Sequence, residues 1–179
     1  MKKMIKLFRY RQRPENFAAN SVIYALKRIN RSDVREFCIE KLSASISASV
    51  ADPSKCIFTN IPRRRSAVLK YGMDHSALLA RGIALELGAK YLPTLSSKAK
   101  RAQKQLSADE RKKNAVFAIK TKADLSGKTV ILVDDIVTSG ASMAEGAKHL
   151  RAIGAKEVIG AALAIAYRDD SPQFEFTFF

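Results

Sequence analysis

Hydrophobic and polar positions along the chain follow two periods, and the two periods alternate. Short, nearly continuous apolar runs occupy residues 56–61, 91–92, 129–133 and 157–166, and such runs are typical of strands buried in a parallel sheet. Between them, apolar residues recur every three to four positions, which predicts helices with one buried face. The recurring residues are Val34, Cys38, Leu42, Ile46 and Val50, then Leu79, Ile83 and Leu87, then Met143, Ala147 and Leu150. Strands that alternate with helices predict an α/β fold, a parallel sheet flanked by helices, with ligands at the carboxyl ends of the strands.

Polar residues and glycines mark the expected ends of these helices. Asp33 with Glu36 has the spacing of a capping box, and Asp74 is placed to cap the helix that follows it. Gly88 and Gly154 each come directly after a helical face, where glycine commonly ends a helix. The sequence therefore predicts the start of the first of these helices, both ends of the second and the end of the third.

Two basic segments interrupt the alternation of strands and helices. Residues 1–31 contain nine Lys or Arg and one acid, with a short helix predicted around Leu26. Residues 93–127 form a long polar connection with a small strand predicted at 115–119, and long connections of this kind are usually functional lids or disordered. Near the end of the chain, alternating phenylalanines predict a half-exposed edge strand over 174–178. At 179 residues the chain is expected to form a single domain.

Composition indicates an anionic partner. The net charge of +15 favours binding to a phosphorylated metabolite, a nucleic acid or a membrane surface. No apolar run approaches the roughly 20 residues that span a membrane, and no signal-peptide core follows the basic start, so we expect a soluble cytoplasmic protein. Cys38 and Cys56 are the only two cysteines; we expect both to be buried hydrophobic residues and expect no structural zinc.

The candidate chemistry lies directly after the apolar run 129–133. Two acids, Asp134 and Asp135, are followed by a small hydroxyl- and glycine-rich turn and then by a helical pattern. Carboxylates accept hydrogen bonds from sugar hydroxyls, and the N–H groups and dipole of a helix start hold a phosphate. Gly140 allows a positive φ in the turn. Because neighbouring strand residues face opposite ways, both acids face one ligand only if the strand ends before them.

The acid pair has two other interpretations. An apolar run that ends in acid also occurs as a Walker B strand, which binds Mg²⁺ beside a nucleotide. That site needs a Walker A loop, G-x-x-x-x-G-K-[ST], which this sequence does not contain. The acids could also be capping residues without a ligand. The order of strand, acids, turn and helix favours a sugar-phosphate site over both.

Residues 130–142 resemble the signature of the type I phosphoribosyltransferases, which bind 5-phosphoribosyl-1-pyrophosphate (PRPP). The resemblance implies that Asp134 and Asp135 contact the ribose. It also implies that the turn holds the 5′-phosphate through Thr138, Ser139, Gly140, Ala141 and Ser142. In that family Mg²⁺ is carried by the pyrophosphate, so we expect no direct metal ligand from the protein, only water-mediated contact with the two acids.

A second pattern resembles the ComF group within that superfamily. Its residues are Gln103, Leu106, Glu110, Arg111, Asn114 and Phe117, and the regions around Leu26-Lys27 and Leu78–Arg81 fit as well. The group usually has a cysteine-rich zinc module, which this sequence lacks. Where the group has Arg-Gly-aromatic-Asn-Gln, this chain has Tyr71-Gly72-Met73-Asp74-His75. Lys70 is the candidate replacement for the missing arginine, and His75 is expected at the surface of a helix start, with a role as catalytic base the lesser alternative.

Basic residues in two loops are candidates for binding pyrophosphate. Arg63, Arg64 and Arg65 follow the first predicted sheet strand, and guanidinium groups suit a pyrophosphate and its Mg²⁺; a solvated loop or a nucleic-acid contact is the alternative. The resemblance implies that 93–127 is the flexible loop that closes over PRPP, and Lys104 and Arg111 are placed to reach the leaving pyrophosphate. The alternative is a solvated loop without a direct role.

The sequence thus predicts a Mg²⁺-dependent phosphoribosyltransferase that transfers ribose 5-phosphate to an unidentified nitrogen nucleophile and releases pyrophosphate. The alternative is a non-catalytic PRPP- or nucleotide-binding regulator, or an accessory protein of DNA uptake. Residues 1–31 are expected to form a small hood over the site and, with 166–179, the acceptor pocket. The resemblance also implies a homodimer. Nucleic acid is a lesser alternative as a partner because no aromatic-basic stacking motif is present.

Overall fold

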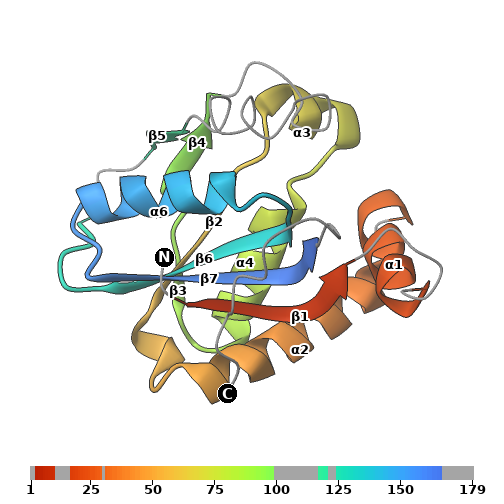
Figure 1. The fold of residues 1–179 in the computed structure, drawn as a ribbon, viewed down its shortest axis with the longest axis horizontal. Helices are drawn as coiled ribbons and strands as arrows, with labels where there is room; N and C mark the ends of the chain where they lie inside the picture. Colours follow the sequence, from red (N-terminus) through yellow and green to blue (C-terminus); the bar gives the residue numbers. More distant parts are fainter. Residues whose placement is uncertain (1–2, 11–16, 30, 99–116, 121–123, 167–179) are drawn as a thin grey trace.

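The computed structural model describes residues 3–10, 17–29, 31–98, 117–120 and 124–166 (Figure 1). The strands are β1 (Met4–Tyr10), β2 (Ile57–Asn60), β3 (Lys90–Tyr91), β4 (Leu95–Ser97), β5 (Phe117–Ile119), β6 (Thr129–Val137) and β7 (Glu157–Ala166). The α-helices are α1 (Phe17–Tyr24), α2 (Ser32–Ser49), α3 (Arg65–Tyr71), α4 (His75–Glu86) and α6 (Ala141–Ala152). A π-helical turn, η2 (Ala25–Ile29), continues α1, and a 3₁₀ turn, η3 (Pro53–Lys55), precedes β2.

Five strands form one parallel sheet in the order β1-β7-β6-β2-β3. The central strand β6 pairs with β2 on one side, with Ile57 opposite Val130, and with β7 on the other, with Thr129 opposite Glu157. The α/β fold predicted from the hydrophobic pattern is therefore confirmed. Because the strands are parallel, the loops after β2 and β6 leave the same edge of the sheet.

Helices cover both faces of the sheet, as Figure 1 shows for α6 on one side and α2 on the other. On one face, Ile131 and Val133 of β6 belong to a buried cluster with the predicted stripes of α2 and α4. On the other, Val130 and Leu132 belong to a cluster with the stripe of α6. The two clusters lie on opposite faces because successive side chains along a strand point to opposite sides of the sheet. Packing of α6 against its face places the start of α6 beside the end of β6.

Some of the helix ends predicted from the sequence are confirmed and one is not. Asp74 caps α4, since its carboxylate accepts from the Ala77 N–H at 3.3 Å, and Gly88 and Gly154 have positive φ of 63° and 98°. The prediction of a capping box at Asp33 was wrong. Helix α2 begins at Ser32, so Asp33 lies in its first turn, where it accepts from Arg31 Nε at 3.0 Å.

The long connection 93–127 begins and ends in a small antiparallel ribbon. Strand β5 confirms the predicted small strand, and β4, which was not predicted, pairs with it from Leu95 opposite Ile119 to Ser97 opposite Phe117. Leu95 and Phe117 are buried in the cluster beneath α6. Lys104 and Arg111, the candidate lid residues, lie outside the described residues, as does the predicted edge strand at 174–178.

The N-terminal segment contributes a strand that the sequence did not predict. Residues Met4–Tyr10 form β1, which pairs with β7 at the sheet edge, from Met4 opposite Gly160 to Tyr10 opposite Ala166. The apolar run at 56–61, predicted as the first sheet strand, is therefore the second. Part of the segment expected as a hood is instead built into the sheet.

Both cysteines are buried and free, as predicted. Burial raises the pKa of the Cys38 thiol to about 11, so that thiol is protonated at neutral pH. In the described part of the chain, no cluster of three or more His, Cys, Asp or Glu side chains is arranged to hold a metal ion. Nor is any helix within those residues both long and apolar enough to cross a membrane.

Candidate functional site

The two acids lie inside β6, not after it. The strand continues to Val137, and Asp134 stands opposite Ala162 of β7. The expectation that the strand ends before the acids was wrong, because β7 runs on to Ala166 and keeps the ladder intact. As neighbours in an extended strand, the two carboxylates have different surroundings.

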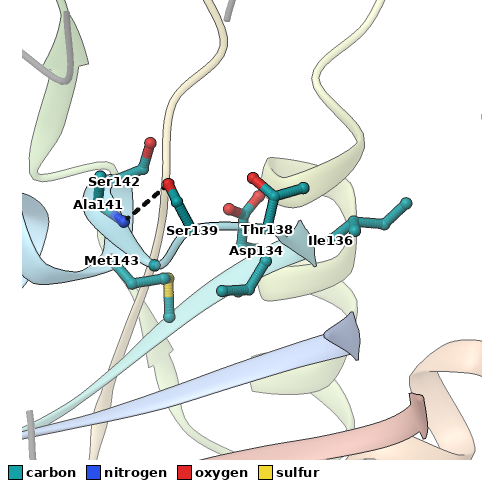
Figure 2. A pocket seen from close by; sticks show the side chains of 9 residues that line it. Asp134, Ile136, Thr138, Ser139, Ala141, Ser142 and Met143 are labelled. Atoms are coloured by element: carbon teal, nitrogen blue, oxygen red, sulfur yellow. Dashed lines mark hydrogen bonds between the residues drawn. The ribbon is translucent and has the colours of Figure 1, made fainter. Parts of the chain in front are cut away.

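The Asp134 carboxylate lies beside the start of α4 and the turn after β6. Its Oδ1 accepts from Ser76 Oγ at 3.0 Å and from the backbone N–H of Asp135 at 2.8 Å. Figure 2 shows its side chain at the border of the hollow formed by the turn. Two donors from different elements thus fix the orientation of this acid.

The Asp135 carboxylate is held by the N-terminal segment. Asp135 is 8% exposed, its Oδ2 lies 2.8 Å from Lys27 Nζ of η2, and its Oδ1 accepts from the Ile136 N–H at 2.6 Å. Sequence reasoning assigned Lys27 no role. The one signal for it was the similarity of the Leu26-Lys27 region to the ComF group.

Burial raises the pKa of Asp134 above its ordinary value, and the neighbouring Asp135 carboxylate raises it further. The Asp135 N–H, Lys27 and Ser76 oppose this shift without cancelling it. At pH values between the ordinary pKa of 3.8 and the raised pKa of Asp134, this carboxyl group is protonated in the folded protein and ionised in the unfolded chain. Folding stability attributable to Asp134 therefore falls as pH rises through this window.

We expect Asp134→Asn to stabilise the fold at alkaline pH. The amide keeps an oxygen that can accept from Ser76 and from the Asp135 N–H, and it removes the cost of a buried charge. The gain in unfolding free energy is expected to be about 1–2 kcal/mol at pH 8.5, or about 2–8 °C in Tm, shrinking toward pH 4. Thermal unfolding across pH measures it. The exposed control Asp52→Asn, which loses its partner Lys55, should not gain stability; a Tm gain for Asp134→Asn that is equal at all pH values would contradict this account.

The turn after β6 has the backbone of an anion-binding helix start. Gly140 is the N-cap of α6 with φ of 71° and ψ of −4°, so the glycine is used for the positive φ that the sequence predicted. Ser139 Oγ accepts from the Ala141 N–H at 3.5 Å (Figure 2). A small open hollow is lined by Asp134 and residues 136–143. A carboxylate and helix-start amides thus border one small polar space, which suits a sugar phosphate.

The arginine loop leaves the same edge of the sheet after β2. Asp74 anchors it, because Asp74 Oδ2 accepts from the Arg63 backbone N–H at 2.9 Å while Oδ1 caps α4. Arg64 is half-buried as the N-cap of α3, and Arg65 is exposed at its first residue. Lys70 belongs to α3, but its side chain lies outside the described part. The loop follows β2, and the acid pair lies near the carboxyl end of the neighbouring strand β6, so both are at the same edge of the sheet.

His75 is not at the surface, contrary to expectation. It is the first residue of α4, yet it is 2% exposed, and its Nδ1 has no hydrogen-bond partner among the described residues. Burial lowers the pKa of His75, and Arg63 and Lys27 lower it further against the opposing effects of Asp135 and Asp74. The imidazole is therefore neutral at pH 7. The start of α4 is buried because it lies against the carboxyl ends of the strands, where Ser76 meets Asp134.

Comparison with known proteins agrees with this geometry. Residues 73–174 match the phosphoribosyl transferase domain family. The DNA utilization protein YhgH of Salmonella typhi is 30% identical over 144 residues, which are 76% of this chain and 63% of that protein. YhgH of Escherichia coli K12 is 28% identical over the same shares. The chain thus spans less than two thirds of the length of these relatives.

Solved structures share the fold at low sequence identity. Adenine phosphoribosyltransferase from Saccharomyces cerevisiae superposes with a TM-score of 0.53 at 17% identity, over 78% of this chain and 72% of that one. Phosphoribosylpyrophosphate synthetase from Mycobacterium smegmatis superposes with a TM-score of 0.51 at 22% identity, over 76% of this chain and 36% of that one. At these identities the likeness establishes the fold.

Proposed function

Because this chain belongs to the phosphoribosyl transferase domain family, as a ComF-like member, we propose that it binds PRPP and transfers its ribose 5-phosphate to a nitrogen nucleophile. The observation that carries the proposal is the polar hollow after β6. A carboxylate held by two donors and a glycine turn at the start of α6 lie side by side there. These are the groups that a ribose and its 5′-phosphate require.

Each residue has a defined part in the proposal. Asp134, which borders the hollow, accepts a hydrogen bond from one ribose hydroxyl, and Asp135, which faces the other side of the strand, accepts from a second hydroxyl at the strand's end. Residues 138–142 hold the 5′-phosphate through backbone N–H groups and hydroxyls. Arg63, Arg64 and Arg65, with Lys70, bind the pyrophosphate from the neighbouring strand end. Lys104 and Arg111 reach the leaving group from the loop between β4 and β5.

In the reaction, the lone pair of the acceptor nitrogen forms a bond to the anomeric carbon. The bond from that carbon to the pyrophosphate oxygen breaks, and its electron pair leaves with pyrophosphate; the acceptor then loses a proton to water. The protein contributes position and charge, because a ribose held at two points presents its anomeric carbon to one side. No covalent intermediate with the protein is needed.

Mg²⁺ is part of the proposal, and the acids fit it. Carboxylate oxygens are the hard ligands that Mg²⁺ prefers, and Asp134 borders the hollow. Because the described residues contain no three-ligand cluster, the ion would be held mainly by the pyrophosphate, with Asp134 and Asp135 reached through water. When bound, it neutralises negative charge on the leaving pyrophosphate.

Calorimetric titration of the folded protein with PRPP, with and without Mg²⁺, tests the proposal. We expect micromolar binding with Mg²⁺ and weaker binding in EDTA, and we expect ribose 5-phosphate to compete. Release of pyrophosphate across a panel of ammonia, amines and nucleobases then identifies the acceptor. No detectable heat with millimolar PRPP and Mg²⁺ would overturn the donor assignment.

A second candidate function is a PRPP-responsive protein of DNA handling without turnover. Two observations favour it: the curated relatives are named DNA utilization proteins, and the net charge is +15. DNA binding measured against salt concentration, with and without PRPP, separates the two functions. Two results together would favour this candidate: DNA binding that falls steeply with salt and is weakened by PRPP, and no pyrophosphate release with any acceptor.

A further inference from the structure

Lys27 lies at the acid pair although it comes from a distant part of the sequence. Its Nζ is 2.8 Å from Asp135 Oδ2, and the two side chains are 27% and 11% exposed. Ion pairs such as Lys55–Asp52 join near neighbours on the surface, where the side chains are 83% and 44% exposed. The Lys27 pair instead joins the segment after β1 to the centre of the sheet.

The backbone around Lys27 is anchored, which makes its position a property of the fold. Lys27 is in the middle of η2, and π-helical turns occur frequently at functional sites. The preceding residue, Leu26, is 1% exposed and belongs to the buried cluster that contains Val133. Asp135 is two residues after Val133 on the same strand and so has the same facing. Burial of Leu26 therefore brings the next side chain to Asp135.

Stability of the fold is a poor explanation for the presence of the Lys27–Asp135 ion pair. Partly buried ion pairs recover little more than the desolvation of their own charges. Asp135 also has a second donor, the Ile136 N–H, so its carboxylate is fixed from two directions. This is the support that a binding carboxylate needs in order to meet a ligand with one orientation.

We propose that Lys27 is a positioning residue of the donor site, a role that rests on the proposed function. It fixes the orientation of the Asp135 carboxylate so that a remaining lone pair accepts from a ribose hydroxyl. The N-terminal segment is thereby part of the PRPP site through one ammonium group. Lys27 itself does not contact the ligand in this arrangement, because its charge is already engaged by Asp135.

PRPP affinity of Lys27→Met, measured by calorimetry with Mg²⁺, tests the role. Methionine keeps an unbranched side chain of similar length and removes the charge. We expect affinity to fall about 10- to 100-fold, the loss of one hydrogen bond to a charged group. The matched control Lys55→Met breaks an equally short pair away from the site and should change affinity less than about 2-fold. Lys27→Arg keeps the charge and should recover part of the loss.

A double-mutant cycle separates positioning from a general structural effect. In the Asp135→Asn background, Lys27→Met should have little further effect on affinity, because the carboxylate that Lys27 positions is gone. Equal losses in both backgrounds would overturn the role, as would unchanged or tighter binding by Lys27→Met when the wild type binds. If the wild type itself does not bind PRPP, the proposed function and this role fail together; if it binds and the cycle shows no coupling, only the role fails.

Discussion

Replacing both acids, Asp134→Asn with Asp135→Asn, is expected to lower PRPP affinity by more than about 100-fold. Each substitution puts an amide NH₂ in place of an oxygen that would accept from a ribose hydroxyl, and leaving a buried polar partner unsatisfied costs about 1–3 kcal/mol. Asp134 borders the hollow, and Asp135 is oriented by Lys27 and the Ile136 N–H. Calorimetry with PRPP and Mg²⁺ measures the loss, with Asp52→Asn as the surface control.

The double variant should remain folded, so the loss of affinity is interpretable. The Asp134 change removes the cost of ionising a buried carboxyl group with a raised pKa, and is favourable at alkaline pH. The Asp135 change leaves Lys27 without its carboxylate and is unfavourable. Circular dichroism and thermal unfolding check the balance of the two. A folded double variant that binds PRPP within about threefold of the wild type, a difference below 1 kcal/mol, would place the ribose elsewhere.

Replacing Gly140 with valine is expected to reduce PRPP affinity about 10- to 100-fold. Its φ of 71° lies in the left-handed region, which a β-branched residue adopts only at a cost of about 1–3 kcal/mol. The turn is expected to relax to a negative φ and withdraw the N–H groups at the start of α6 from the phosphate. Among the described residues, apart from its chain neighbours, nothing lies within 4 Å of the Cβ position at Gly140, so the effect acts through the backbone and not through a clash.

Gly88→Val is the matched control for this backbone effect. Gly88 also has a positive φ, of 63°, with open space around its Cβ position, but it follows the end of α4, at the opposite end of that helix from Ser76. Both variants should lose similar stability in thermal unfolding, and only Gly140→Val should lose affinity for PRPP and ribose 5-phosphate. Equal affinity losses in the two variants would show that the turn after β6 has no special role.

The sequence was sufficient for the parts of the fold that rest on local patterns. The stripes of α2, α4 and α6, the cap at Asp74 and the glycine turn at Gly140 each follow from the chemistry of residues close together in the chain. The arginine loop and the acid pair were placed at one edge of the sheet because parallel strands require it. These predictions needed no knowledge of which strands are neighbours.

Features that depend on distant partners were missed. Strand β1 is stabilised by pairing with β7, and its own residues, with Lys6 and Arg9 in the run, resemble a basic tail more than a buried strand. The length of β6 was underestimated because β7, and not the local sequence, decides where the ladder ends. His75 was expected at the surface because the local sequence marks it as the start of a helix but does not show which elements pack against that start. Lys27 was without a role for the same reason.

The pairing of β1 with β7 has a consequence for synthesis on the ribosome. Met4–Tyr10 is made before the rest of the described chain, whereas its sheet neighbour within the described residues, Glu157–Ala166, is made after most of them. Strands β2, β3 and β6 can pair before that point, but β1 must wait. Closing such a long loop is slow. Lys27 follows β1 in the chain, so its contact with Asp135 is expected to form among the last steps of folding. Nascent chains would then gain the complete environment of the acid pair only after β7 has been made.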